Sequence, residues 1–117
     1  HIGCVPVCNA NKNIVGLVTD RDLILRTLAC EKDIKHTPVS EVMTTNVYKT
    51  TPEADTKDAS KIMCDCQVRR VPVVENEQLV GIITLGDLAN NQNVSPEEVT
   101  VTVEGICKCG GNAQNAE

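Results

Sequence analysis

The sequence predicts two copies of one small unit that is built from both strands and helices. Two observations lead to this prediction: an apolar pattern occurs twice, and the same polar residues close both copies. Val5-Pro6-Val7 returns as Val71-Pro72-Val73, and Gly16-Leu17-Val18-Thr19 returns as Gly81-Ile82-Ile83-Thr84. The offset is 66 residues at the first element and 65 at the second, so the second turn is one residue shorter. A duplication of this period indicates one supersecondary unit used twice.

The first copy is predicted to contain a hairpin followed by a helix. Apolar runs flank an Asn-rich turn at residues 9–13, which is typical of two antiparallel strands. Thr19 is a suitable N-cap, because Asp20 and Asp22 would then lie in the first turn of the helix. The expected elements are strands over residues 2–8 and 14–18, a helix from Asp20 to about Lys32, and a polar connector over residues 33–40.

The second copy is predicted to be more complete, in the order strand, helix, strand, strand, helix. Thr51-Pro52-Glu53 has the residues of a helix start, with threonine as the cap and proline at the first helical position. Helical spacing then predicts a buried face formed by Ala59, Ile62, Met63 and Cys66. The other expected elements are a turn and a strand over residues 42–49, strands over residues 68–74 and 79–83, and a helix from about Leu85.

Beyond residue 90 the repeat is no longer recognisable. Residues 90–93 and 110–117 have the polar composition of loops or disordered segments. Residues 99–103 alternate between apolar and polar side chains, as an edge strand does. We therefore expect a first unit over residues 1–36, a second unit over residues 37–90, and a C-terminal tail over residues 91–117 that is partly disordered or an edge strand.

The first copy lacks its beginning in this sequence. His1 aligns with Gln67, so the strand and helix that would match residues 46–66 are missing before it. The hairpin would then expose the apolar face that such a helix should cover. We expect the natural chain to carry this segment upstream of His1.

The composition argues against several classes of function. The net charge is −5 and the basic residues are scattered, which is unlike a nucleic-acid-binding face. The chain has no Phe or Trp and one Tyr, so it lacks aromatic platforms on which bases stack. No apolar run approaches the roughly 20 residues of a membrane span, and the N-terminus has no signal-peptide pattern. A cytoplasmic location is expected. Because no base–nucleophile pair and no P-loop is recognisable, we expect the chain to have no enzymatic activity and no covalent cofactor.

The seven cysteines allow two interpretations. Four of them lie within or beside apolar patterns, where a free cysteine usually behaves as a small buried hydrophobe; these are Cys4, Cys8, Cys30 and Cys64. Cys64-Asp65-Cys66 and Cys107-Lys108-Cys109 are C-x-C pairs, which leave a metal or redox sensor as an alternative. Structural zinc sites use two to four intervening residues, so the spacing favours reduced thiols and no metal site.

Four sequence motifs occur together and in order over residues 2–90. They are Pro38-Val39-Ser40-Glu41-Val42-Met43-Thr44, Arg69-Arg70-Val71-Pro72-Val73-Val74, and the two strand–helix junctions Gly16-Leu17-Val18-Thr19-Asp20-Arg21-Asp22-Leu23 and Gly81-Ile82-Ile83-Thr84-Leu85-Gly86-Asp87-Leu88. In this combination the chain resembles a tandem pair of CBS domains, the modules named for cystathionine β-synthase, as found in small stand-alone bacterial-type proteins. The resemblance implies an α+β fold of two β-α-β-β-α units related by a pseudo-twofold axis. It also implies AMP, ADP, ATP or S-adenosylmethionine as the ligand, bound in clefts between the units.

The recurring threonine and aspartate are the first candidate ligand-binding residues. Thr19 and Thr84 lie where a strand gives way to a helix, so their hydroxyls and nearby N–H groups can face an anion. Asp22 and Asp87 follow in the first helical turn, where a carboxylate can accept two hydrogen bonds from a ribose diol. The alternative is purely structural, because a threonine N-cap with an acid at the third helical position forms a variant of the capping box.

Three arginines and two valines complete the candidate site. Arg21, Arg69 and Arg70 are candidate phosphate contacts, with surface ion pairing as the alternative. Arg69 and Arg70 are consecutive strand residues and point to opposite faces, so only one of them can serve one cleft, and Arg70 is favoured. Val47 and Val68 are expected to line the adenine base.

These observations predict a regulatory or sensor module that binds an adenosine-containing ligand. A homodimer through the CBS-like units is expected, with an unknown effector protein and with neither nucleic acid nor membrane as a partner. A ligand-free dimerisation scaffold is the alternative from another class of function. Gly86 stands where the first copy has Arg21, so the two clefts are expected to differ in charge.

Overall fold

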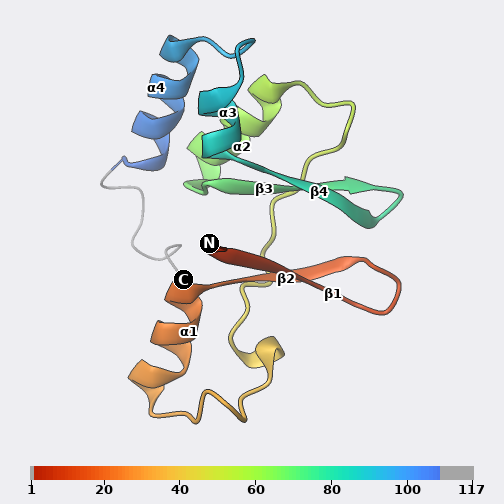
Figure 1. Ribbon diagram of the computed structural model, residues 1–117, viewed down its shortest axis with the longest axis vertical. Coiled ribbons are helices and arrows are strands. Elements are labelled where there is room, and N and C mark those ends of the chain that lie inside the picture. The colour runs from red at the N-terminus through yellow and green to blue at the C-terminus, as the bar shows by residue number, and fades with distance from the viewer. Residues whose placement is uncertain (1, 109–117) are drawn as a thin grey trace. The chain divides into compact units, whose positions relative to one another are not determined.

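The computed structural model describes residues 2–108 and contains two compact units, which divide after Val47. Each unit has one two-stranded antiparallel sheet together with helices, so the predicted α+β class is confirmed. Figure 1 shows both units with their elements labelled. Among the described residues, no helix is long and apolar enough to cross a membrane.

Unit 1 is a hairpin followed by a helix, as predicted. Its elements are β1 (Cys4–Cys8), β2 (Ile14–Thr19), α1 (Asp20–Arg26) and two single-turn 3-10 helices, η1 (Leu28–Cys30) and η2 (Val39–Glu41). α1 ends six residues before the expected Lys32. The Thr27 N–H still bonds the carbonyl of Leu23, but the backbone then tightens into η1, and Glu31 ends η1 in the left-handed region with φ 57°.

The segment at residues 42–44 forms hydrogen bonds with the unit 1 hairpin and packs against it. Thr44 and Leu17 exchange two backbone hydrogen bonds of 2.8 and 2.9 Å. Met43 lies against Gly16, where a Cβ would come within 2.6 Å of the Met43 sulfur, and Val42 is buried. These contacts place residues 37–47 with unit 1, whereas the sequence repeat assigns them to the second unit. The ranges 1–36 and 37–90 stay a prediction about the repeat.

Unit 2 is a hairpin with three helices. Its elements are α2 (Thr56–Cys66), β3 (Arg70–Glu75), β4 (Gln78–Thr84), α3 (Leu85–Asn90) and α4 (Pro96–Ile106). Figure 1 shows these helices on one side of the β3–β4 hairpin. The core consists of Met63, Val71, Leu88 and Val94, which come from α2, β3, α3 and the loop before α4. Of the predicted helical face, Ala59 and Met63 are buried, while Ile62 and Cys66 are half-buried.

Two predictions for residues 42–66 were wrong. α2 begins at Thr56 and not behind Thr51, because Asp55 and Asp58 form a complete capping box: the Asp55 carboxylate accepts from the backbone, and Asp58 bonds back to the Asp55 N–H. A capping box satisfies two backbone N–H groups that are otherwise unpaired at a helix start, whereas a proline at the first position supplies only a favourable φ. Residues 42–49 form no strand, and the only ladder contacts there and at the next residue are isolated bridges at Thr44 and Thr50.

The prediction of an edge strand at residues 99–103 was also wrong, because these residues lie within α4. The Ser95 hydroxyl caps the helix by accepting from the Glu98 N–H, and Pro96 occupies the first turn. Thr102 donates its hydroxyl hydrogen to the Glu98 carbonyl at 2.7 Å and is buried, so the polar half of the alternation is satisfied inside the helix. The predicted disorder at residues 110–117 lies outside the described residues.

The cysteines are less buried than predicted. Cys8 and Cys30 are exposed, while Cys4 and Cys64 are half-buried. Cys8 is the last residue of β1, beside the exposed Asn-rich turn, and Cys30 ends η1 with its thiol directed at the Leu25 carbonyl. Both lie at the ends of elements, where an apolar pattern no longer ensures burial.

Candidate functional site

The two Thr-x-x-Asp sequences occupy the same place in each unit. Thr19 ends β2 and caps α1, and Thr84 ends β4 and caps α3. In each case the aspartate N–H donates to the threonine hydroxyl oxygen, at 3.2 Å for Asp22 and 3.1 Å for Asp87. The threonine N–H donates in return to Oδ2 of the aspartate, at 2.9 and 2.8 Å. The structural alternative, a capping box, is therefore present in both units.

Capping uses only part of the hydrogen-bonding capacity of these side chains. Each threonine hydroxyl also donates to Oδ2 of its aspartate, at 3.1 Å in unit 1 and 2.8 Å in unit 2. The hydroxyl hydrogens are thus committed within the box and are not directed at an outside anion. Since these bonds all fall on Oδ2, the second carboxylate oxygen, Oδ1, is the atom that a ligand hydroxyl can reach.

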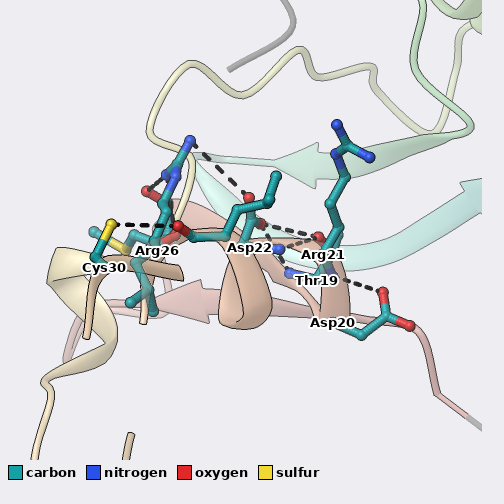
Figure 2. Close-up of polar contacts among 9 residues, drawn as sticks. Thr19, Asp20, Arg21, Asp22, Arg26 and Cys30 are labelled. Carbon is teal, nitrogen blue, oxygen red and sulfur yellow. Dashed lines mark hydrogen bonds and ion pairs between the residues drawn. The ribbon is translucent and has the colours of Figure 1, made fainter. Parts of the chain in front are cut away.

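The surroundings of Oδ1 differ between the two ends. In unit 1, Asp22 Oδ1 lies 4.0 Å from Nη2 of Arg26, and the Asp22 side chain is only 15% exposed. Arg26 also donates through Nη1 to the carbonyls of Val42 and Met43, at 3.0 and 2.8 Å (Figure 2). In unit 2, Asp87 is exposed, and the position that matches Arg26 holds Asn91, a neutral amide that cannot form an ion pair with Asp87. Asp87 is therefore the more open carboxylate.

The three candidate arginines lie in different environments. Arg21 is exposed, and Figure 2 shows its side chain extending away from Asp22. Arg70 is half-buried and begins β3, where it is the cross-strand partner of Thr84. Arg69 is exposed and holds the start of α3 through its carbonyl, which accepts from Leu85 N at 2.9 Å. The structure thus brings both arginines of unit 2 to the strand–helix junction of that unit.

Sequence reasoning missed what stands opposite Thr19. The cross-strand partner of Thr19 is Cys4, a half-buried thiol at the position where unit 2 has Arg70. The signal was present in the sequence, since the 66-residue offset aligns Cys4 with Arg70. One unit therefore places an arginine in the strand opposite its capping threonine, and the other places a cysteine there.

The two candidate base-lining valines belong to different units. Val47 is half-buried and is the last residue of unit 1. Val68 is half-buried in unit 2, between α2 and β3, where it packs against the core around Met63. Each is an apolar surface of its own unit.

The C-x-C pair at Cys64 and Cys66 cannot bind one metal ion together. Residues two apart on an α-helix point about 200° away from one another. Cys64 Sγ is directed at α4, 3.7 Å from the carbonyl oxygens of Val101 and Thr102. Burial raises the pKa of Cys66, although a hydrogen bond with Tyr48 acts in the opposite direction. Among residues 2–108, no three potential ligands are grouped around a metal position. Of the second pair, Cys107 is exposed and Cys109 lies outside the described residues.

The order of elements and the recurring capping boxes define the class of protein. The CBS domain model matches residues 1–28 and 39–93, so the chain belongs to the CBS domain family, which consists of regulatory modules. The CBS domain-containing protein YhcV of Bacillus subtilis is 46% identical over 92 residues, which are 79% of this chain and 64% of YhcV. The chain thus spans less than two thirds of that relative.

Solved structures agree with the family assignment. Hypoxic Response Protein I, in a crystal structure with two coordinated zinc ions, is 33% identical with a TM-score of 0.70, over 77% of this chain and 72% of that one. The CBS domain pair of protein MJ0100, in complex with 5′-methylthioadenosine and S-adenosyl-L-methionine, is 28% identical with a TM-score of 0.65, over 75% and 68% of the two chains. The zinc ions and the adenosine compounds are properties of those two proteins.

Proposed function

We propose that this chain is a non-catalytic regulatory module that binds an adenosine-containing ligand through its Thr-x-x-Asp ends. The observation that carries the proposal is the state of Asp87: its Oδ2 is fixed by Thr84, while the side chain is exposed and Oδ1 is open. A fixed carboxylate with an open oxygen is a preorganised acceptor for the two hydroxyl groups of a ribose. A binding geometry already held by the capping box costs little ordering entropy when the ligand arrives.

The remaining candidate residues fit the other parts of such a ligand. Arg70 begins the strand opposite Thr84 and supplies a cation for phosphate, with Arg69 and Arg21 as more exposed positive groups. Val47 and Val68 offer apolar surface for adenine. AMP, ADP, ATP and S-adenosylmethionine all share the adenosine group that this arrangement would recognise, and the likeness to the MJ0100 domain pair with its two adenosine compounds supports this ligand class.

Isothermal titration with these four compounds tests the proposal, and the Asp87→Ala variant is the decisive comparison. Asp87 also caps α3, so its loss affects the fold as well as the site. Asp58→Ala is the matched control, because Asp58 has the same third-position role in the capping box of α2 in the same unit. Loss of a charged hydrogen-bond acceptor is expected to weaken binding by roughly tenfold or more in Asp87→Ala and to leave Asp58→Ala unchanged.

Two outcomes would overturn the proposal. One is the absence of binding to the chain at millimolar concentrations of all four compounds. The other is wild-type affinity in Asp87→Ala. Sedimentation of the same samples separates the alternative, since a homodimer whose assembly and stability are indifferent to every compound would be a dimerisation scaffold.

A further inference from the structure

We propose that Arg26 is a positioning residue that couples ligand binding at Asp22 to the segment at residues 42–44. The proposal rests on the proposed function in one respect, namely that a ligand contacts Asp22. It goes further by assigning a role to an arginine outside the Thr-x-x-Asp sequence and by giving unit 1 a response that unit 2 lacks.

The guanidinium of Arg26 joins two parts of unit 1, helix α1 and the segment at residues 42–44. Its Nη1 donates to the carbonyls of Val42 and Met43 at 3.0 and 2.8 Å, and its Nη2 lies 4.0 Å from Oδ1 of Asp22. The side chain is 31% exposed, and Figure 2 shows its guanidinium beside the Asp22 carboxylate. A planar guanidinium can serve several acceptors at once, which a lysine ammonium does with less geometric precision.

The length of the Asp22–Arg26 contact leaves Asp22 able to bind. At 4.0 Å the pair is an ion pair but too long for a hydrogen bond, so Oδ1 keeps its acceptor capacity. The positive charge of Arg26 nevertheless lies beside a carboxylate that is only 15% exposed and attracts it. Arg26 therefore positions Asp22 without occupying the atom that a ribose hydroxyl would use.

The other end of the contact is a segment that is well placed to respond. Val42 is 2% exposed, Met43 packs on Gly16, and Thr44 is bonded to Leu17 in β2. Three residues further on, the chain leaves unit 1 at Val47 and enters unit 2. A shift of the Asp22 carboxylate toward a ligand changes the electrostatic field at the Arg26 guanidinium. Because Arg26 bonds the carbonyls of Val42 and Met43, this change alters the stability of the segment at residues 42–44.

The corresponding place in unit 2 provides a natural comparison. Asn91 occupies the position of Arg26, and its side chain accepts from the backbone N–H of Asn93 at 2.9 Å. A neutral amide cannot attract the Asp87 carboxylate as the Arg26 guanidinium attracts that of Asp22. The coupling is therefore assigned to unit 1 alone.

Hydrogen exchange of the full 117-residue chain, with AMP as the probe, tests the proposal in two steps. Without ligand, Arg26→Met is expected to speed exchange of the Thr44 amide, which bonds the Leu17 carbonyl, by roughly tenfold, because two charge-assisted bonds to the segment are lost. Arg26→Lys should recover part of this protection. Lys35→Met, which removes an exposed cation from the same unit, should have no effect.

With AMP, the background is Asp87→Ala, so that only the unit 1 end responds. AMP is expected to change exchange at residues 42–44 in this background, and the change should disappear when Arg26→Met or Asp22→Asn is added. An identical AMP response with and without Arg26 would overturn the coupling. Unchanged exchange of the Thr44 amide in ligand-free Arg26→Met would show that Arg26 does not hold the segment at residues 42–44 and would overturn the proposal. If AMP changes nothing in any variant, the ligand-dependent half fails together with AMP as a ligand, while the ligand-free comparison still decides whether Arg26 holds the segment.

Discussion

Replacement of Gly105 with alanine is expected to destabilise unit 2, because α4 lies directly against α2 at this residue. A Cβ at position 105 would lie 2.6 Å from Sγ, 2.8 Å from Cβ and 3.1 Å from Cα of Cys64. The thiol can rotate away, but the Cβ and Cα atoms are fixed to the α2 backbone, so the two helices must separate. Such overpacking costs about 1–3 kcal/mol, and the two contacts below 3.0 Å favour the upper half of that range.

The net effect also includes the helix preference of alanine. Glycine in a helix is about 1 kcal/mol less favourable than alanine, and less near a terminus such as this one. The expected net loss is therefore about 1–2 kcal/mol, or a fall in Tm of roughly 5–15 °C for a chain of this size. Thermal unfolding followed by circular dichroism and urea titration would measure it.

Gly86→Ala is the matched control in the same unit. Its nearest neighbour would be Thr84 Oγ1 at 3.6 Å, an ordinary contact, so this variant should be neutral or up to about 1 kcal/mol more stable. In the double variant with Cys64→Ala, part of the loss should be recovered, because the 2.6 Å contact is removed while the 2.8 Å contact stays. A Tm at or above that of the wild type in Gly105→Ala would refute the packing of α4 on α2 described above.

Two further predictions concern titratable groups. Hydrogen bonds from the Lys57 N–H and the Thr56 hydroxyl lower the pKa of Asp55 in the folded chain. Its carboxylate therefore stabilises the fold at pH values above the unfolded pKa of about 4. This contribution to stability is lost as the pH falls through the lower pKa of the folded state. Asp55→Asn keeps a capping side chain and should remove this part of the pH dependence of urea unfolding below about pH 4; an unchanged profile would contradict it. Alkylation near pH 8, followed by mass spectrometry, should modify the exposed thiols of Cys8, Cys30 and Cys107 before that of Cys66, because burial raises the pKa of Cys66. Equal rates in the folded chain would count against this environment.

Features that depend on neighbours in the sequence could be predicted from the sequence. The hairpins and the helices that follow them arise from an apolar run, a polar turn and a threonine cap within about 20 residues, and the structure reproduces them in both units. The Thr-x-x-Asp boxes are equally local, since each is complete within four residues. Family motifs then connect these elements to a known fold.

The features that sequence reasoning missed depend on contacts between distant residues or on competing local signals. The alternating residues of α4 favour a strand by pattern, but the Ser95 cap and the small residue Gly105 allow a helix to pack closely on α2. The start of α2 was misplaced because two capping signals, at Thr51 and Asp55, lie four residues apart. Arg26 could not be identified, because its partners at Val42 and Met43 follow it by 16 and 17 residues.

The differences between the two repeats carry the information about ligand chemistry. Both ends have the same capping box, so the box alone cannot distinguish one ligand from another. What differs is the cross-strand neighbour, Arg70 in unit 2 and Cys4 in unit 1, and the residue four positions after the aspartate, Asn91 and Arg26 respectively. A phosphate gains a charge-assisted contact where a cation is held beside the box. In unit 1 the Arg26 cation is already engaged with two carbonyls and a carboxylate, and the exposed Arg21 side chain extends away from Asp22, whereas the half-buried Arg70 begins the strand opposite Thr84 in unit 2. We therefore expect phosphorylated adenosine compounds to favour the unit 2 end, and Arg70→Met to reduce the preference for AMP over adenosine there without altering the response of residues 42–44 in unit 1.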